Sequence, residues 1–588
     1  MSVIKLPGVI MTKKHYLLTF LAGVLIFPLF LFSANAGGGK LYEKQPEPKP
    51  ESLLSKGITP ITGTFIQPWL YTHFTPERWE KELDFWEELG VEYIIMGDTL
   101  TCSATPINDP SKWVITAYYD TKNPSFNKGK DYLSLIFQKC SERGIKVFSG
   151  IGNTLDLWPY LGPSAPGFDN VCTLFAEVAE DLYSSYYEKY PETFAGFYFV
   201  PELFNSSAFD TEAARGKYVT KIASGFNIIF ETINRVDSSL PFILSPYVNM
   251  FGGDWVSKSP QNISLFWKEL LAESGFRDGD ILCPQDSMGA GGADLTLLGE
   301  VTAAYKAAVD GCGKDIKLWS NCEIFEQPTG KFYDNYDGYG YWGSATIDRM
   351  TSQFQVVAPY VERIFAFAAP HYLSPNNTVD GYYDSYKFYL EHGILDPSPP
   401  TPPTEFRTIY QFVSGKKTLC VCFSGMYDNL GIHKVNIYKD GELFTYRLAT
   451  RNESGSVGEI YPNNFIDLDY DPQTNESVTY EFEVIDCSGN KSGRVSFTVE
   501  PGSVPNNIRL SPFYNGPTEN KPFYPGDIDG DFKLTSSDLA KVKLHILGLD
   551  AMDDGGVKSA DMDSNGAVNI TDYITLWREV KKSAETDE

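Results

Sequence analysis

The sequence predicts a multidomain protein in which an α/β barrel of the TIM (β/α)8 type precedes a small all-β sandwich and a short α-helical domain. Three observations lead to this fold class. Between residues 58 and 394, a short apolar run followed by a helical pattern occurs eight times. Residues 405–500 contain strand-like runs separated by turn residues, and residues 524–583 contain an acidic loop in two copies. The length of 588 residues suits roughly three to five domains of ordinary size.

The composition is that of a folded, acidic protein. The chain has 49 Lys and Arg against 76 Asp and Glu, a net charge of −27 at pH 7, and 14% of its residues are aromatic. Disordered acidic chains are poor in aromatic residues, so this chain is expected to be globular. A nucleic-acid-binding protein needs a basic face to neutralise phosphates, so we expect no nucleic-acid partner. The nine cysteines are spread along the chain and do not indicate a disulfide framework.

The N-terminus has the features of a secretory signal. Two lysines precede an apolar run over residues 17–32, and a small-x-small pattern that ends at Ala36 follows it. These features predict a signal peptide over residues 1–36, cleaved after Ala36, and hence a secreted, extracellular protein. The alternative is a retained membrane anchor, for which the run is short and interrupted by Pro28. Residues 37–57, rich in Pro, Glu and Lys, are expected to form a flexible linker.

Eight apolar runs in the first large region have the length of buried strands, and helical patterns separate them. For example, Thr75-Pro76 is typical of a helix N-terminus, and Gly90 is typical of the end of the same helix. Eight alternating strand and helix units predict a (β/α)8 barrel over residues 58–394, with a doubly wound open sheet as the alternative. The predicted strands cover residues 61–68, 91–98, 146–153, 194–202, 242–249, 280–286, 317–323 and 363–371.

The proline-rich sequence PSPPTPP predicts a semi-rigid linker over residues 395–404 and hence a domain boundary. The strand-like runs of residues 405–500, one of which leads into an Asp/Ser/Gly/Asn turn, predict a β-sandwich. This region resembles the immunoglobulin-like and fibronectin-III-like modules appended to bacterial enzymes. Cys420 and Cys422 alternate along one strand and are expected to pack on the same side of it. A second linker is expected over residues 501–523.

The C-terminal repeat has the spacing of two calcium-binding loops. Ca²⁺ takes about six to eight oxygen ligands, and an EF-hand-type loop provides them from positions 1, 3, 5, 7, 9 and 12, position 7 through its main-chain carbonyl. The second copy begins at Asp561, 34 residues after the first begins at Asp527, so an ordinary acidic turn is the weaker interpretation. The predicted ligands are Asp527, Asp529, Asp531, Lys533, Thr535 and Asp538 in the first loop and Asp561, Asp563, Asn565, Ala567, Asn569 and Asp572 in the second.

An amphipathic helical pattern follows each loop, and residues 524–583 as a whole resemble a type I dockerin. The resemblance implies two bound calcium ions and calcium-dependent docking into a cohesin module of a scaffold protein, as in cellulosomes. Phe532 stands where the loop usually has Gly, which predicts a weaker first site. Dockerins carry partner-recognition residues at loop positions 10 and 11, and the residues there are Ser536 and Ser537 in the first repeat and Ile570 and Thr571 in the second.

The active site of a (β/α)8 barrel lies at the C-terminal ends of its strands, so the residues there are the candidates for chemistry. Glu202 ends the fourth predicted strand in GFYFVPELFN, and Glu323 ends the seventh in KLWSNCEIFE. A buried, unpaired carboxylate is costly, so two of them at strand ends indicate function. The candidate substrate-binding residues near the strand ends are Trp69, Asn153, Asn205, Tyr247, Asp286, Asn321, His371 and Tyr372.

Strands four and seven are where clan A glycoside hydrolases, which are retaining (β/α)8 enzymes, carry their catalytic carboxylates, and the barrel resembles this class. It resembles more closely a poorly characterised bacterial barrel family assigned to the glycoside hydrolases. The resemblance implies Glu202 as proton donor and then base, and Glu323 as nucleophile. Such a pair needs carboxyls about 5–5.5 Å apart, one protonated and one ionised. Clan A enzymes usually have Asn before the strand-four Glu, but Pro201 stands here, so Asn205 or Asn321 would hold the 2-hydroxyl of the sugar.

Other interpretations of these residues stay open. In one, Glu202 and Glu323 are structural ion-pair partners, and in another Asp286 replaces either of them as a catalytic carboxylate. Aromatic residues such as Trp69 suit core packing as well as sugar stacking. No second histidine or cysteine stands at ligand spacing from His371, so we expect it to hydrogen-bond substrate rather than bind metal, and we expect no cofactor for catalysis.

The sequence therefore predicts a secreted glycoside hydrolase that acts on polysaccharide and is docked on a scaffold, at the cell surface or in a cellulosome. Docking would raise its concentration near the substrate without changing its own site. The alternative is a non-catalytic carbohydrate-binding barrel delivered by the same dockerin, and a structural spacer is a third hypothesis.

Overall fold

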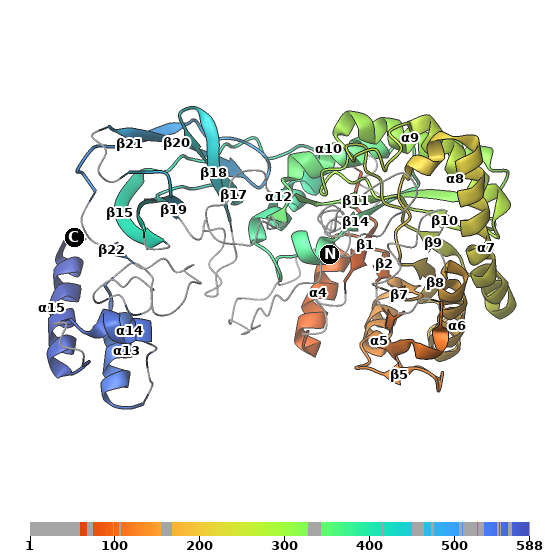
Figure 1. Ribbon diagram of the computed structural model, residues 1–588, viewed down its shortest axis with the longest axis horizontal. Coiled ribbons are helices and arrows are strands. Elements are labelled where there is room, and N and C mark those ends of the chain that lie inside the picture. Colours follow the sequence, from red (N-terminus) through yellow and green to blue (C-terminus); the bar gives the residue numbers. More distant parts are fainter. Residues whose placement is uncertain are drawn as a thin grey trace, which may run out of the picture.

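A computed structural model gives the fold of the chain (Figure 1). The predicted signal peptide and the linker after it lie outside the described residues. Within the described part of the chain, no helix has both the length and the apolar character needed to cross a membrane. The structure describes residues 59–586 except 68–73, 98, 105–107, 155–166, 327–342, 414–415, 450–463, 472–475, 505–507, 510–525, 527, 529–533, 550–551, 553 and 563–566.

Eight parallel strands close into a barrel, and their order around it is their order along the chain (Figure 1). β1 pairs with both β2 and β14, which closes the ring. Each strand lies inside one of the eight predicted runs, so the barrel is confirmed and the open sheet is excluded. The strands are β1 (Gly63–Ile66), β2 (Tyr93–Met96), β6 (Lys146–Gly150), β8 (Phe194–Phe199), β9 (Phe242–Leu244), β10 (Ile281–Leu282), β11 (Lys317–Glu323) and β14 (Arg363–Phe367).

Helices between the strands cover the outside of the barrel (Figure 1). α4 begins as predicted, because the Thr75 side chain accepts a hydrogen bond from the Arg78 N–H, and Gly90 beyond its end has a φ of +73°. Trp79 and Trp86 on one face of α4 are buried. The helices are α4 (Pro76–Glu88), α5 (Leu133–Arg143), α6 (Phe168–Tyr186), α7 (Glu212–Asp237), α8 (Pro260–Glu273), α9 (Leu295–Gly311), α10 (Ile347–Val357), the single turn α11 (Ala369–Tyr372) and α12 (Asp380–His392).

Large side chains fill the interior of the barrel. Phe65, Phe148, Trp319 and Phe365 belong to one buried cluster there, and the rings of Trp319 and Phe365 stack with their centroids 5.0 Å apart. Trp319 is therefore a core residue rather than a surface for a sugar ring. Because the interior is filled, polar residues can gather only at the mouth of the barrel.

A small four-stranded sheet that the sequence did not indicate lies at the C-terminal rim of the barrel. Its strands are β3 (Leu100–Ser103), β4 (Val114–Ala117), β5 (Asn127–Lys128) and β7 (Asn153–Thr154). β3 follows β2 and β7 follows β6, which places the sheet at the end of the barrel where those strands finish. Asn153 was predicted to end a barrel strand, but it belongs to this rim sheet and pairs with Thr101.

Two four-stranded sheets form the predicted sandwich, with strand orders β19-β16-β15-β22 and β18-β17-β20-β21. Cys420 and Cys422 are buried in one small cluster, as expected from their spacing, and none of the nine cysteines, all of which the structure describes, forms a disulfide. β22 lies inside the segment predicted as the second linker. The strands are β15 (Glu405–Val413), β16 (Lys416–Ser424), β17 (Ile432–Lys439), β18 (Glu442–Leu448), β19 (Asn464–Asp467), β20 (Val478–Asp486), β21 (Val495–Val499) and β22 (Ile508–Arg509).

Barrel and sandwich pack directly against each other. One continuous hydrophobic core contains side chains of both, and α12 contacts β17. The main-chain N–H groups of Ile347 and Asp348, at the start of α10, donate to the carbonyls of Cys487 and Ser488 in the sandwich at 2.8 and 3.2 Å. The two domains therefore form a joint with both apolar and hydrogen-bonded contacts.

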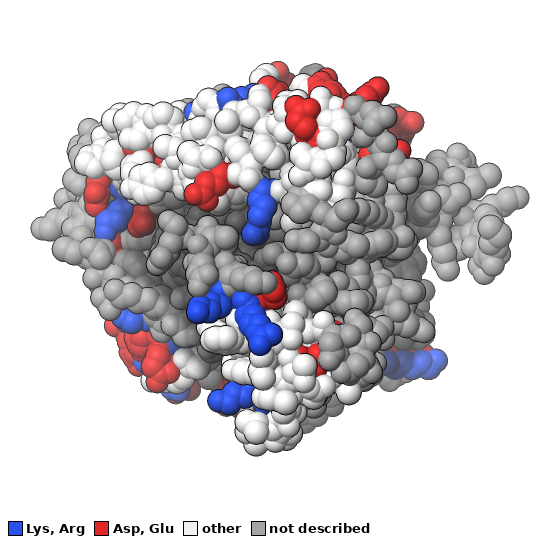
Figure 2. Space-filling view, turned by 90° about the vertical axis from the view of Figure 1, so that its left-hand side faces the viewer, with Lys and Arg blue, Asp and Glu red and all other residues white. Residues whose placement is uncertain are grey.

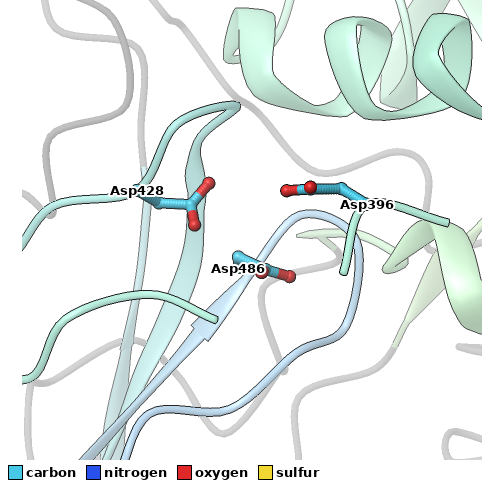
Figure 3. A group of neighbouring side chains, drawn as sticks. All are labelled: Asp396, Asp428 and Asp486. Carbon is cyan, nitrogen blue, oxygen red and sulfur yellow. The ribbon is translucent and has the colours of Figure 1, made fainter. Parts of the chain in front are cut away.

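The predicted proline-rich linker is anchored on the sandwich. Asp396 within it lies beside Asp428 and Asp486, with one carboxylate oxygen of each within 4.8 Å of the others (Figure 3). Main-chain N–H groups and the side chains of Asn429 and Asn490 donate to five of the six carboxylate oxygens. These hydrogen bonds stabilise the junction of linker and turns, and we assign no metal to the cluster.

Three helices, α13 (Ser536–Ile546), α14 (Asp554–Ala560) and α15 (Ile570–Thr586), form the C-terminal domain at the end of the molecule away from the barrel (Figure 1). α13 packs against α15, and α13 and α15 begin within the two predicted loops, as the repeat requires. On the face seen from this end, the described Lys and Arg side chains lie among Asp and Glu side chains (Figure 2). The small core of the domain consists of Leu539, Val542, Ala560 and Leu576.

Candidate active site and calcium loops

Two carboxylic acids lie at the C-terminal mouth of the barrel. Glu323 is the last residue of β11 and is 4% exposed, and Glu202 follows β8 by three residues and is half-buried. The parallel strands bring both to the same end of the barrel. The charge of Glu202 acts on Glu323, and both charges act on the Tyr247 hydroxyl, whose pKa is raised first by burial and then by them. The three side chains therefore lie near enough to one another to interact electrostatically.

Each of the two carboxyls has its own hydrogen-bond donor. Oε1 of Glu202 accepts from Nε2 of Gln285 at 2.7 Å. Oε2 of Glu323 accepts from the main-chain N–H of Ala290 at 2.6 Å, and the Arg349 guanidinium also lies close enough to act on it. A main-chain donor and a nearby cation favour the ionised form of a carboxyl. These two groups therefore oppose the effect of burial on the Glu323 carboxyl.

Burial raises the pKa of both carboxyls. It raises the pKa of Glu202 to about 7, against the hydrogen bond from Gln285. Burial, followed by the charges of Asp286 and Glu202, raises the pKa of Glu323 to about 8, against the Ala290 hydrogen bond and Arg349. Neighbouring carboxyls that repel each other lose their protons one at a time. The first of the two protons therefore leaves near neutral pH.

Asp286 holds the main chain of Glu323. It is 2% exposed, its Oδ1 accepts from the main-chain N–H of Glu323 at 3.0 Å and of Met288 at 3.2 Å, and its Oδ2 accepts from Gln353. Burial raises the pKa of Asp286, and these hydrogen bonds oppose the rise. Because both oxygens are engaged inside the protein, a role in positioning Glu323 fits this arrangement better than a contact with substrate.

Two residues of α10 that the sequence analysis missed also hold this strand end. The Arg349 side chain donates to the carbonyls of Glu323, at 3.1 Å, and of Phe325. Gln353 donates to the same Glu323 carbonyl at 3.2 Å. The two are four residues apart and share a helix face. A polar pair at this spacing on a partly buried helix was the feature of the sequence that could have identified them. Nothing in the sequence shows, however, that the pair faces a strand end.

The two asparagines proposed to contact a sugar differ in their surroundings. Oδ1 of Asn205 accepts from the main-chain N–H of Asn249 at 2.8 Å, and its Nδ2 donates to the carbonyls of Asn249 and Ser257 at 3.0 and 2.7 Å. Its amide is thus engaged in holding the loop after β9. Asn321 donates to Ser245 at 3.1 Å, but its buried Oδ1 accepts no hydrogen bond from the described residues. Asn321 therefore keeps an acceptor on the strand of Glu323.

The remaining predicted residues lie around this centre. His371 and Tyr372 form the end of α11, just after β14. Burial lowers the pKa of His371 to about 3, so its imidazole is neutral at neutral pH. The ring of Tyr372 lies 5.4 Å from that of Phe325, beside β11. Asn153 lies in the rim sheet and Trp69 outside the described residues.

The two C-terminal loops fold alike at position 12. Asp538 accepts from the main-chain N–H groups ten and three residues before it at 2.7 and 2.8 Å, and Asp572 does the same at 2.9 and 2.8 Å. This equivalence is what a repeated loop requires. Of the other predicted ligands, Thr535, Asp561, Ala567 and Asn569 are described, whereas Asp527, Asp529, Asp531, Lys533, Asp563 and Asn565 lie outside the described residues.

The predicted partner-recognition residues are on the surface. Ser536, Ser537, Ile570 and Thr571 are all exposed, at the starts of α13 and α15. Apolar side chains are exposed nearby in the sequence, including Ile570 at 60% and Trp577 at 49%. Large apolar side chains exposed on a small domain favour a protein-binding role.

Two segments of the chain match known protein families. Residues 525–581 match the family described as dockerin type I domain. The fold and the loops therefore define a (β/α)8-barrel protein with a type I dockerin, a domain that binds calcium, implies a cohesin partner and occurs in secreted cellulosome components. Residues 61–379, more than half of the chain, match a second model, and the chain belongs to this family, described as a domain of unknown function (DUF4434).

A search of the curated proteins gave no match. Among solved structures, a "putative alpha-L-fucosidase" from Bacteroides thetaiotaomicron is 17% identical, covers 60% of this chain and 98% of its own, and has a TM-score of 0.41. An intracellular xylanase from Thermoanaerobacterium saccharolyticum is 12% identical over 56% of this chain and 92% of its own, with a TM-score of 0.33. A beta-glucuronidase from Bacteroides uniformis is 10% identical over 77% and 46%, with a TM-score of 0.33. Similarity at this level does not bear on the activity of the barrel.

Proposed function

We propose that the barrel is a retaining glycoside hydrolase that acts on polysaccharide, with Glu202 as acid and then base and Glu323 as nucleophile. The observation that carries the proposal is the pair itself: two carboxyls at the mouth of a filled barrel that interact electrostatically and have raised pKa values. Perturbed carboxyl pairs at the C-terminal ends of barrel strands are where acid–base chemistry is found.

The proposed reaction assigns one state to each carboxyl. In the first step Glu202 gives its proton to the leaving oxygen while Glu323 bonds to the anomeric carbon, which leaves a glycosyl-enzyme and a free alcohol. In the second step Glu202 takes a proton from water, the water oxygen bonds to the anomeric carbon, and Glu323 leaves as a carboxylate. Gln285 and Ala290 hold the two carboxyls in place, and the buried Oδ1 of Asn321 lies on the strand that ends at Glu323.

We propose further that the dockerin binds two calcium ions, one in each loop, and docks the secreted protein into a cohesin of a scaffold. The matched hydrogen bonds of Asp538 and Asp572 support two equivalent loops. The proposed contacts with cohesin are Ser536 and Ser537 in the first repeat and Ile570 and Thr571 in the second.

A glycan panel tests the proposed activity. The full-length protein and the variants Glu202→Ala and Glu323→Ala would be incubated with a broad set of polysaccharides, and the products would be analysed. Hydrolysis by the wild type alone supports the assignment. Equal hydrolysis by all three proteins would show that the pair is wrong. Binding of glycans by the wild type without hydrolysis would instead identify a carbohydrate-binding barrel.

The pH dependence of kcat/KM should have two limbs. Glu202 must be protonated to donate, and Glu323 must be ionised to attack. Burial raises the pKa of Glu202 to about 7 and that of Glu323 to about 8, so the form with both correct states is a minor fraction, and kcat/KM should peak between about pH 7 and 8 and fall on either side. Because the charge of Asp286 raises the pKa of Glu323, Asp286→Asn should move the acidic limb to lower pH.

Asp280→Asn is the matched control for this experiment. Asp280 is equally buried but lies at the opposite end of β10, where Arg277 pairs with it at 2.7 Å. This variant should leave both limbs of the profile in place. The assignment of the acidic limb to Glu323 fails if Asp286→Asn and Asp280→Asn give the same profile as the wild type.

A further inference from the structure

The segment that follows the candidate nucleophile is held from the sandwich. β12 (Phe325–Glu326) begins two residues after Glu323 and pairs with β13 (Gly343–Ser344). Oε1 of Glu326 accepts hydrogen bonds from Nε2 of His433 at 3.1 Å and from Nζ of Lys434 at 3.0 Å. Both donors are on β17. The sandwich therefore contacts the chain three residues beyond Glu323.

His433 connects two parts of the barrel. Its side chain is fully buried, and Nδ1 lies 2.8 Å from the hydroxyl of Tyr382 on α12. Burial lowers the pKa of His433, so the imidazole is neutral at neutral pH. A neutral imidazole that accepts from Tyr382 at Nδ1 carries its proton on Nε2 and donates it to Glu326. A chain of hydrogen bonds thus runs from the barrel through the sandwich and back to the barrel.

Glu326 remains charged within this chain. Burial raises its pKa, but the hydrogen bond from His433 and the charge of Lys434 outweigh burial and hold the pKa below its usual range. At neutral pH the cation beside Glu326 is Lys434. A buried carboxylate with two donors from one strand has little freedom to move, because losing either donor leaves the buried charge with one partner fewer.

The sandwich also fixes α10, which holds Glu323 from the other side. The first N–H groups of α10 donate to the carbonyls of Cys487 and Ser488, whereas the residue before the helix gives no side-chain cap. At Gly489, which has a φ of +104°, a Cβ atom would come within 2.2 Å of the Asp348 carboxyl. The close fit of this turn against the helix therefore depends on glycine. Arg349, one residue further along, donates to the Glu323 carbonyl.

We propose that His433 is a positioning residue for Glu323 and that the sandwich is a constituent of the catalytic unit rather than a tethered accessory module. The proposal rests on the proposed role of Glu323. Its physical basis is that a nucleophile must be held near its attack position, and a displacement of about 1 Å can cost about 100-fold in rate. Loss of the His433 hydrogen bonds would release the chain that follows Glu323.

Three variants of the full-length protein test this role. His433→Leu removes both hydrogen bonds, whereas His433→Gln can still accept from Tyr382 and donate to Glu326 through its amide. Phe482→Leu is the matched control. Phe482 packs in the sandwich core against Phe406 and Phe423, so its replacement weakens the sandwich without changing this chain of hydrogen bonds. Each variant would be measured for thermal midpoint, for kcat and KM, and for amide hydrogen exchange over residues 323–326.

We expect His433→Leu to lower kcat about 10- to 100-fold with little change in KM, and to speed exchange over residues 323–326. His433→Gln should restore both, and Phe482→Leu should lower only the thermal midpoint. Equal kcat in the wild type and His433→Leu, or equal exchange over residues 323–326, would overturn the proposal. A wild type without hydrolytic activity would contradict the proposed function instead, and the exchange rates would still decide whether His433 holds the segment.

Discussion

Replacement of Glu323 by alanine should lower hydrolysis by at least about 10³-fold, because the residue proposed to form the glycosyl-enzyme is gone. Azide should restore turnover of an aryl glycoside of the preferred sugar. With Glu323 absent, azide bonds directly to the anomeric carbon while Glu202 protonates the leaving phenolate. The product should be a glycosyl azide with inverted configuration, which NMR spectroscopy identifies.

Replacement of Glu202 by alanine should give the opposite stereochemistry. Glu323 still forms the glycosyl-enzyme when the leaving group needs no proton, and azide then displaces Glu323 without the help of a base. The product should be a glycosyl azide with retained configuration. Natural polysaccharide, whose leaving group needs the proton, should be cleaved about 10²–10⁴-fold more slowly.

The two products separate the roles of the two carboxyls. Reversed configurations in the two variants would show that Glu202 is the nucleophile and Glu323 the acid. The absence of an azide product in both variants would show that neither carboxyl has the proposed role. Glu180→Ala is the matched control. Glu180 lies on the surface of α6 and pairs with Arg235, so this variant should behave as the wild type.

Removal of calcium with excess EDTA should weaken binding of the chain to a cohesin by more than about 100-fold. Without the ion, the carboxylates gathered in each loop repel one another, and the loops no longer hold α13 and α15 in their binding arrangement. Binding would be measured by calorimetry against a set of type I cohesins. Addition of calcium in excess of the chelator should restore it.

The same experiment has internal controls. EDTA already saturated with calcium should leave docking intact, and hydrolysis by the barrel should continue in the chelator, because no metal is expected in the reaction. Asp538→Ala and Asp572→Ala, which remove position 12 of one loop each, should each weaken docking. Cohesin binding that persists unchanged in the chelator would contradict calcium-dependent docking.

The barrel was predictable because its signals are local. A buried parallel strand needs a short apolar run, and a covering helix needs an apolar face with start and stop residues, as at Thr75 and Gly90. These patterns located all eight strands. The rim sheet was missed because β5 and β7 are two residues long and β7 pairs with β3 of another loop, so no run in the sequence marks them.

The carboxyl pair was also predictable, but its surroundings were not. Glu202 and Glu323 stand at strand ends, and the direction of parallel strands places them at one mouth. Arg349 and Gln353 come from a helix, and whether their side chains reach a strand end depends on how that helix packs. Asn205 had the right residue type near the right strand, yet its amide is engaged by the loop after β9.

The sequence by itself determined the elements of this protein: eight strand and helix units, a sandwich and a repeated acidic loop. Each element follows from the periodicity of neighbouring residues or from fixed ligand spacing, and these two kinds of pattern do not depend on residues far away in the chain. Only the tertiary structure decided what joins the elements. Glu326 and His433 are 107 residues apart in the chain, and their hydrogen bond exists because two separate domains bury one surface together. Contacts of that kind depend on the packing of whole domains, which no local pattern encodes.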